Sequence, residues 1–246
     1  MLDLRGLTIG TDAAMLVGDL SLSLPMTGIT ALIGPSGCGK SSVLKWSAGI
    51  LPKDLDGEGQ LMLDGQAIAR PCPAISYQPQ SDALFPWLTV AQNAALGLQV
   101  RGLSRAEALN RVAPLFSSFG LKGTEGQFPD QLSGGMRQRA AFLRTVVQDS
   151  RYVLLDEPFS ALDAVTRLRM QDWLIARLAE RPRGVLLVTH DLHEATRLAD
   201  VILVMAGPPG RIVAEIPVPH PPTQRSEAAL APLRDELKSL LLENAP

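Results

Sequence analysis

The alternation of hydrophobic and polar positions predicts that the first third of the chain is rich in strands. Its alternating or continuous apolar stretches are short enough for strands: residues 2–9, 20–25, 29–34, 59–68 and 74–78. The Asp64-Gly65 pair should form the turn of a hairpin within residues 59–68. Residues 39–50 are expected to form a helix.

The pattern changes to a helical one over residues 81–149. Ser104 and Glu107 form a capping box at the start of a helical repeat. Pro114 lies inside that repeat and should kink or split the helix, because proline cannot donate a backbone hydrogen bond. A further helix is expected over residues 133–144. The pattern therefore predicts a helical insert between two strand-bearing parts.

Strand patterns return after the insert. Residues 153–155 and 184–189 are unbroken apolar runs, as expected of parallel strands that are covered on both faces. Residues 164–179 are predicted to form the crossover helix between them. Two further strands, residues 201–205 and 211–216, should complete the sheet. The pattern predicts an α/β protein.

The chain is predicted to divide into a main domain and a short tail. Residues 2–80 and 150–217 form the predicted core of the main domain, and residues 81–149 form its helical insert. Residues 218–246 form the tail, which contains an amphipathic helix. The apolar stripe of that helix consists of leucines: Leu230, Leu233, Leu237, Leu240 and Leu241.

Composition excludes several classes of protein. The net charge of -2 gives no basic field, so no nucleic-acid partner is expected. Cys38 and Cys72 lie in predicted loops and are expected to be free thiols. The N-terminus lacks the order of a signal peptide, and the uncharged stretches 20–39 and 83–100 are interrupted by helix-breaking or amide residues. We expect a cytoplasmic chain that does not cross a bilayer.

The stretch GPSGCGKS follows a predicted strand and opens a predicted helix, which is the setting of a phosphate-binding loop. Glycines allow successive backbone N–H groups to face a phosphate, and the helix N-terminus adds partial positive charge. Lys40 should reach the terminal phosphates, the Ser41 hydroxyl should ligate Mg²⁺, and Ser42 should bond the inner phosphate. The predicted phosphate-binding residues are Gly34, Pro35, Ser36, Gly37, Cys38, Gly39, Lys40, Ser41 and Ser42.

Two acids end the buried strand in VLLDE. Asp156 would hold Mg²⁺ through water, and Glu157 would polarise the water that attacks the γ-phosphate. Acids at strand ends are often helix caps or loop residues, so this interpretation depends on the phosphate loop.

A second glycine-rich stretch, LSGGMRQR, is predicted to start a helix capped by Ser133. Its glycine N–H groups could face an anion, but it has no lysine that could hold a triphosphate. By itself this is half a phosphate site or an ordinary helix start.

These motifs occur in a characteristic order. GPSGCGKS, Gln80 ahead of LFPWLTV, LSGGMRQR, VLLDEPFSALD and VTHD have the order and approximate spacing of ATP-binding cassette (ABC) transporter ATPases. The chain resembles that family over residues 2 to about 217. The resemblance implies a P-loop NTPase (RecA-like) core with an N-terminal antiparallel β-subdomain and an inserted α-helical subdomain. It also implies hydrolysis of ATP with Mg²⁺.

The same resemblance implies a site shared between two copies. Packed head to tail, Ser133 and Gly135 of one copy would cap the γ-phosphate of ATP held by Lys40 of the other. Asp163 would signal across this dimer. The second glycine-rich stretch would thereby complete the partner's site.

The resemblance also places two residues beside Glu157. His190 would contact the γ-phosphate and steady the attacking water. Gln80 would sense Mg²⁺ and relay to a membrane partner, and its place before LFPWLTV distinguishes it from Gln78. The expected catalytic set is therefore Glu157, His190 and Gln80, and the expected metal set is Ser41, Gln80 and Asp156.

The sequence departs from the family at two positions. The family usually places an aromatic residue near residue 11 to stack on adenine, but residues 8–18 contain none, so either an aliphatic residue such as Ile9 or Met15 substitutes or contact with the base is weak. Met136 replaces a common glutamine, with little expected effect because the serine and glycine before it are intact.

Three stretches indicate a subfamily. LFPWLTV, LSGGM and the tail MAGPPGRIVAEIPVPHP resemble ATPases of importers for nitrate, alkanesulfonates, taurine and thiamine-precursor pyrimidines. Such importers use separate transmembrane permease subunits and a substrate-binding protein, so this chain would act at the cytoplasmic face of the inner membrane. The apolar LFPWL could dock a helix of the membrane partner or form part of the insert's core.

Two other functions remain open from the sequence. The chain could be a soluble ABC ATPase of DNA repair or translation, although it has no coiled-coil insertion, second cassette or basic patch. It could also be a nucleotide-gated scaffold that does not hydrolyse ATP, against which Glu157 and His190 both argue. The transported solute cannot be read from the residues.

Overall fold

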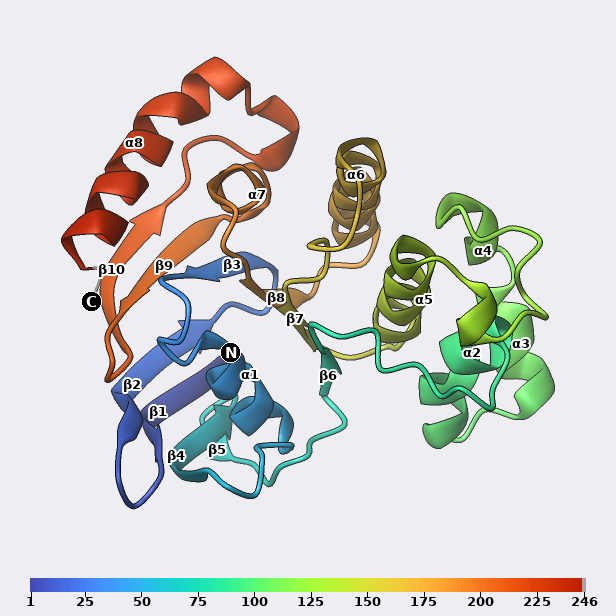
Figure 1. The fold of residues 1–246 in the computed structure, drawn as a ribbon, viewed down its shortest axis with the longest axis horizontal. Coiled ribbons are helices and arrows are strands. Elements are labelled where there is room, and N and C mark those ends of the chain that lie inside the picture. The colour runs from blue at the N-terminus through green and yellow to red at the C-terminus, as the bar shows by residue number, and fades with distance from the viewer. Residues whose placement is uncertain (245–246) are drawn as a thin grey trace.

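A six-stranded sheet forms the centre of the protein, for which a computed structural model describes residues 1–244 (Figure 1). The strand order is β10-β9-β3-β8-β7-β6, with all neighbours parallel except β10 and β9. The strands are β3 (Gly28–Ile33), β6 (Ile75–Gln78), β7 (Tyr152–Asp156), β8 (Gly184–Val188), β9 (Val201–Ala206) and β10 (Arg211–Pro217). The carboxyl ends of the parallel strands share one edge, so the segments that follow them meet there. The α/β prediction is confirmed.

Both faces of this sheet are covered, which explains its continuous apolar runs. In β7, Leu154 packs with the helix and strands of one face, whereas Val153 and Leu155 belong to the apolar core of the other face. In β8, Leu186 and Leu187 divide between the two cores in the same way. Because successive side chains of a strand point to opposite faces, every position in such a strand must be apolar.

One face carries helix α1 (Lys40–Ala48) and a four-stranded antiparallel sheet in the order β2-β1-β4-β5. Its strands are β1 (Leu2–Gly10), β2 (Met15–Leu24), β4 (Asp56–Leu63) and β5 (Gln66–Ala67). The predicted turn at Asp64 and Gly65 is present, with φ of 51° and 82° at the two residues. Both lie in the left-handed region that a tight hairpin turn requires.

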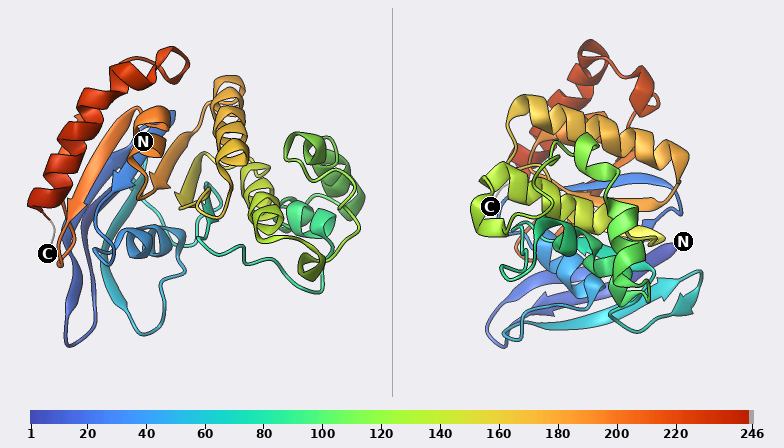
Figure 2. Two further views of the ribbon diagram at one scale, coloured as in Figure 1. Left: turned by 45° about the horizontal axis from the view of Figure 1, so that its top comes forward. Right: turned by 90° about the vertical axis from the view of Figure 1, so that its right-hand side faces the viewer.

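The segment between β6 and β7 is helical and extends to one side of the central sheet (Figures 1 and 2). It contains α2 (Val90–Val100), α3 (Arg105–Val112), α4 (Leu115–Ser118), the 3₁₀ helix η1 (Pro129–Gln131) and α5 (Gly134–Val146). The capping box of Ser104 and Glu107 is formed, and Pro114 separates α3 from α4 as predicted. Edge contacts of Phe119 with Trp173, whose ring centroids are 4.6 Å apart, join the segment to α6.

Three helices cover the other face of the central sheet. They are α6 (Ala164–Glu180), α7 (Leu192–Leu198) and α8 (Glu227–Glu243), and the 3₁₀ helix η2 (Pro222–Gln224) precedes the last of them. The leucine stripe of the tail buries Leu230, Leu233 and Leu237, so α8 packs against the body of the protein. In Figures 1 and 2, α8 and the helices α2 to α5 lie at opposite ends of the molecule.

None of the helices within residues 1–244 has both the length and the apolar content needed to span a lipid bilayer.

Candidate functional site

The loop between β3 and α1 has the shape of a phosphate cradle. Gly37 and Gly39 have φ of 83° and 99°, which residues with a side chain rarely adopt. A Cβ at Gly39 would lie 2.5 Å from Cγ2 of Val17, and one at Gly34 would lie 2.3 Å from the Met205 carbonyl oxygen. Glycine is therefore required by backbone conformation and by close packing. The loop opens directly into the N-terminus of α1, which favours an anion.

Lys40 holds its ammonium group inside this loop. Its Nζ atom donates to the carbonyl oxygens of Gly34 at 2.8 Å and Pro35 at 2.7 Å. Only 8% of the residue is exposed. A buried cation fixed at the mouth of a glycine cradle suits a polyphosphate.

The turn between β9 and β10 supports the phosphate loop from behind. Gly210 donates its N–H to the Leu16 carbonyl oxygen at 2.7 Å, and its own carbonyl accepts from the Gly18 N–H at 3.0 Å. A Cβ at Gly210 would lie 2.1 Å from the carbonyl oxygen of Cys38. In the sequence, GPPG indicates only the subfamily, and no local pattern predicts this contact.

A hydroxyl and a carboxylate meet beside the loop at the end of β7. The Ser41 hydroxyl donates to Oδ1 of Asp156 at 2.9 Å, and the Tyr77 hydroxyl donates to Oδ2 at 3.2 Å. Burial raises the pKa of Asp156, and burial together with the Asp156 charge raises the pKa of Tyr77. Oxygen donors from a serine and an aspartate fit the preference of Mg²⁺ for hard ligands. Tyr77 was not predicted, because its contact with Asp156 depends on the pairing of β6 with β7, which places Tyr77 opposite Leu154.

Glu157 lies between Gln80 and His190, the two residues predicted to lie beside it. Gln80 Nε2 donates to Oε2 of Glu157 at 3.1 Å, and Nδ1 of His190 lies 3.2 Å from Oε1. Glu157 has φ of 46°, a strained conformation for a residue with a side chain, and its N–H donates to the Val188 carbonyl oxygen at 2.9 Å. The structure thus brings Gln80, Glu157 and His190 together at the edge where β6, β7 and β8 end.

Gln78 has a different role from Gln80. It is fully buried, and its Oε1 atom accepts from the Thr145 hydroxyl at 2.7 Å. This contact joins β6 to α5. Gln138, which sequence reasoning missed, also ties α5 to the site, because its Nε2 atom donates to the Pro158 carbonyl oxygen at 3.2 Å.

The second glycine-rich stretch forms the start of α5. The hydroxyl of Ser133 is the helix cap and accepts from the Met136 N–H at 3.3 Å. Asp163 is likewise a cap, and its Oδ1 atom accepts from the Val165 and Thr166 N–H groups. In the described part of the chain, no hydrogen bond joins Ser133 or Gly135 to the phosphate loop. The single chain therefore leaves these two residues outside the group formed around Glu157.

The expectation that Ile9 could contact the base is wrong. Ile9 is 1% exposed and packs in the core between α1 and the antiparallel sheet. Met15 is 55% exposed and lies at the start of β2, opposite Gly10. Of the two aliphatic candidates, only Met15 can reach a ligand at the surface.

Comparison with known proteins is consistent with this geometry. A family model described as ABC transporter matches residues 17–160. A solved structure described as an ATP-binding subunit of an ABC transporter has a TM-score of 0.79 and 26% identity, covering 98% of this chain and 99% of that chain. A dimeric ATP-binding cassette in a post-hydrolysis state, bound to ADP and phosphate, has the same fold with a TM-score of 0.79 at 24% identity, covering 89% of this chain and all of that one.

Curated relatives extend over most of the chain. The formylaminopyrimidine import ATP-binding protein ThiZ of Halalkalibacterium halodurans is 36% identical over 92% of this chain and 90% of its own length. The taurine import ATP-binding protein TauB of Pseudomonas aeruginosa is 42% identical over 81% of this chain and 75% of its own. The aliphatic sulfonates import ATP-binding protein SsuB of Bacillus licheniformis is 38% identical over 93% and 88%.

The chain therefore belongs to the ABC transporter family and is an ATPase of that class. The resemblance inferred from the five motifs is confirmed. The relatives named above are import ATP-binding proteins, which does not favour a role in DNA repair or translation.

Proposed function

We propose that this chain is the ATP-hydrolysing subunit of an importer, and that two copies close head to tail on two molecules of MgATP. The observation that carries the proposal is the position of Glu157, whose two carboxylate oxygens contact Gln80 and His190 beside the buried Lys40 loop. A carboxylate held at the mouth of a phosphate cradle is suited to accept a proton from a water molecule.

Each residue of the site has a separate task in this reaction. Lys40 and the backbone N–H groups of the loop would hold the β- and γ-phosphates, replacing the carbonyl contacts of the lysine. Glu157 would orient the attacking water and take its proton. His190 would hold that carboxylate in place and donate a hydrogen bond toward the γ-phosphate. The strained backbone at Glu157 is of the kind that collects at active sites, where the surrounding contacts hold it.

Ser41, Asp156 and Gln80 are the residues that would hold Mg²⁺. The Ser41 hydroxyl and Asp156 carboxylate are already in contact, so the hydroxyl could hold a cation directly and the carboxylate could hold it through water with little rearrangement. When bound, Mg²⁺ would neutralise charge on the phosphates. Gln80 would have to leave Glu157 to reach the metal, so it would couple metal binding to the release of the Glu157 carboxylate.

The second copy would supply what this chain does not bring to its own loop. Ser133 is exposed at the N-terminus of α5, where backbone N–H groups favour an anion. In a head-to-tail dimer this helix start would cap the γ-phosphate held by the partner, with Asp163 nearby at the cap of α6. A dimeric cassette with ADP and phosphate bound has the same fold, which supports the proposal that this fold can dimerise.

Permease subunits would dock beside Gln80. A groove between the core and the helical segment is lined by Tyr77, Phe85, Val100 and Arg101. Val100 is 79% exposed, and Phe85 packs against Trp87, which lies outside the groove lining and is 68% exposed. An apolar groove of this kind suits a helix of a membrane protein. The chain would thus be peripheral on the cytoplasmic face of the inner membrane.

The cargo would be a small organic anion or a thiamine-precursor pyrimidine, delivered by a substrate-binding protein. The relatives named for taurine, aliphatic sulfonates and formylaminopyrimidine support this class. The chain itself would never contact the cargo. Tests of ATP hydrolysis therefore address the mechanism and not the identity of the cargo.

Replacing Glu157 by Gln is the direct test of the mechanism. The amide keeps the size and one acceptor oxygen but cannot take a proton, so ATP turnover should fall at least ~100-fold while ATP still binds and dimers accumulate. Lys40→Ala should instead weaken ATP binding. Measuring phosphate release, ATP affinity and dimer mass separates the two effects. Unimpaired turnover in Glu157→Gln would refute the assignment of the base.

A further inference from the structure

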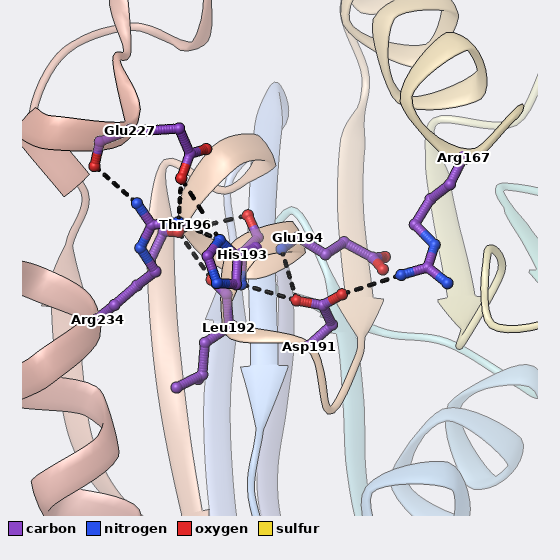
Figure 3. A network of polar contacts seen from close by, with 8 residues as sticks. All are labelled: Arg167, Asp191, Leu192, His193, Glu194, Thr196, Glu227 and Arg234. Atoms are coloured by element: carbon purple, nitrogen blue, oxygen red, sulfur yellow. Dashed lines mark hydrogen bonds and ion pairs between the residues drawn. The ribbon is translucent and has the colours of Figure 1, made fainter. Parts of the chain in front are cut away.

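The C-terminal helix α8 contacts the start of α7 through Arg234 and His193 (Figure 3). His190 lies between β8 and the seven-residue helix α7. The N-terminus of α7 is capped by Asp191, whose Oδ1 atom accepts from the N–H groups of His193 at 2.8 Å and Glu194 at 3.2 Å. The Asp191 N–H in turn donates to the Thr189 hydroxyl at 3.1 Å. The position of His190 is therefore fixed by how α7 begins.

Arg234 holds this helix start from the side of α8. Its Nη1 atom contacts Nδ1 of His193 and donates to Oε2 of Glu227 at 2.7 Å, while Nη2 donates to the Glu227 carbonyl oxygen at 2.7 Å. The Arg234 side chain is only 11% exposed. A planar guanidinium that donates twice to Glu227 and also contacts His193 has one orientation, so it fixes His193 relative to α8.

Arg167 holds the same helix start from the opposite side. Its Nη1 atom donates to Oδ2 of Asp191 at 3.2 Å, and its Nη2 atom donates to the Leu162 carbonyl oxygen at 3.2 Å. Figure 3 shows Asp191 and His193 lying between these two arginines, one from α6 and one from α8. The α7 start is thus held between two elements that are packed into the apolar core.

We propose that Arg234 is a positioning residue for the ATPase reaction, and that α8 acts on catalysis through His193 and the α7 start that holds His190. The inference depends on the proposed role of His190, because Arg234 itself does not reach the reacting atoms. His190 is 3.2 Å from Glu157, so a small shift of the α7 start would lengthen that contact. Displacements of about an ångström at a reacting group can lower rates by up to ~100-fold.

Steady-state ATP hydrolysis tests the proposal with the full-length protein. Arg234→Ala should lower kcat roughly tenfold with the KM for ATP little changed, because the phosphate loop is not touched. Arg234→Lys keeps the positive charge but not the planar guanidinium, so its kcat should lie between those of Arg234→Ala and the wild type. Lys238→Ala is the matched control. Lys238 lies one turn further along α8 than Arg234, and both residues line a hollow that His190 also lines. An unchanged kcat in Arg234→Ala would overturn the proposal.

A double-mutant cycle separates positioning from general destabilisation. If Arg234 acts through His190, adding Arg234→Ala to His190→Ala should lower kcat no further. An equal additional loss in that background would show that Arg234 merely supports the fold, and would refute the inference. If His190→Ala alone keeps wild-type turnover, the proposed role of His190 fails instead. Melting temperatures of each variant show whether the chain remains folded.

Discussion

A Cβ atom at Gly210 would lie 2.1 Å from the carbonyl oxygen of Cys38, so the turn after β9 and the phosphate loop are in direct backbone contact. The two residues are far apart in the sequence, and the contact needs glycine. The turn between β9 and β10, the last two strands of the chain, therefore packs directly against the phosphate loop.

Gly210→Ala should push the phosphate loop out of place. Overpacking in a well-packed region costs about 1–3 kcal/mol, and here the neighbour is backbone that cannot rotate away. We expect ATP affinity to fall roughly tenfold in equilibrium binding, which is about 1.4 kcal/mol. Gly126→Ala is the control, because no atom lies within 4 Å of a Cβ at Gly126. Equal affinities in both variants would contradict the prediction.

Gly135→Ala should affect the proposed dimer and spare the single chain. A Cβ there would meet the Ala161 carbonyl oxygen at 3.6 Å and Leu162 Cδ2 at 3.7 Å, which are ordinary contacts. Alanine also favours a helix over glycine, so the melting temperature should hold or rise. A methyl group beside the partner's phosphate should nevertheless lower turnover at least ~10-fold. Full activity in this variant would count against a phosphate contact at Gly135.

Glu194 should make stability depend on pH. The residue is buried, its Oε1 atom has no hydrogen-bond partner among the described residues, and burial together with the nearby Asp191 charge raises its pKa from 4.5 to about 8. Between these values the folded protein keeps a proton that the unfolded chain releases, so the free energy of unfolding should decrease as pH rises from about 5 to 8.

Glu194→Gln should remove this pH dependence. The amide cannot ionise, so the variant should gain stability relative to the wild type as pH rises, by a few kcal/mol at most. Urea unfolding at pH 6 and pH 8.5 measures the difference, and Glu236→Gln on the exposed side of α8 is the control. A constant difference between variant and wild type across this range would show that Glu194 does not titrate as argued.

Met15 should contribute to ATP affinity in place of an aromatic residue. Met15 is 55% exposed. It lies near the phosphate loop, since the adjacent Leu16 and Val17 pack on Gly39. Met15→Ala should weaken ATP binding several-fold and Met15→Tyr should strengthen it, since stacking adds about 0.5–1.5 kcal/mol. Met26→Ala is the control, because Met26 is similarly exposed at 57% but lies two residues beyond the other end of β2. Identical affinities for all four proteins would exclude Met15 from the base site.

Local signals in the sequence were enough to predict much of the fold. The strands of the central sheet, the capping box at Ser104 and the break at Pro114 each depend on neighbouring residues, and all are present. Two helices were missed. Helix α7 has only seven residues, too few to show a helical period. Helix α2 is marked mainly by a capping box of Thr89 and Gln92, which the pattern of apolar residues does not reveal.

The candidate site was predictable only where a motif marks it. Glu157, Gln80 and His190 could be placed together through the family resemblance, although each looks ordinary alone. Contacts such as Tyr77 with Asp156 join residues far apart in the chain, and no local pattern encodes them. Arg234 with His193 belongs to the same class, since it exists only because α8 folds back onto α7.

The two contacts of Glu157 come from opposite directions along the chain. Gln80 belongs to the segment that leads into α2, and His190 belongs to the segment that leads into α7. A rotation of the helical segment could therefore release one oxygen of this carboxylate while the other stays held. The oxygen that Gln80 releases would then be free to accept the proton of the attacking water, while His190 keeps the carboxylate in place.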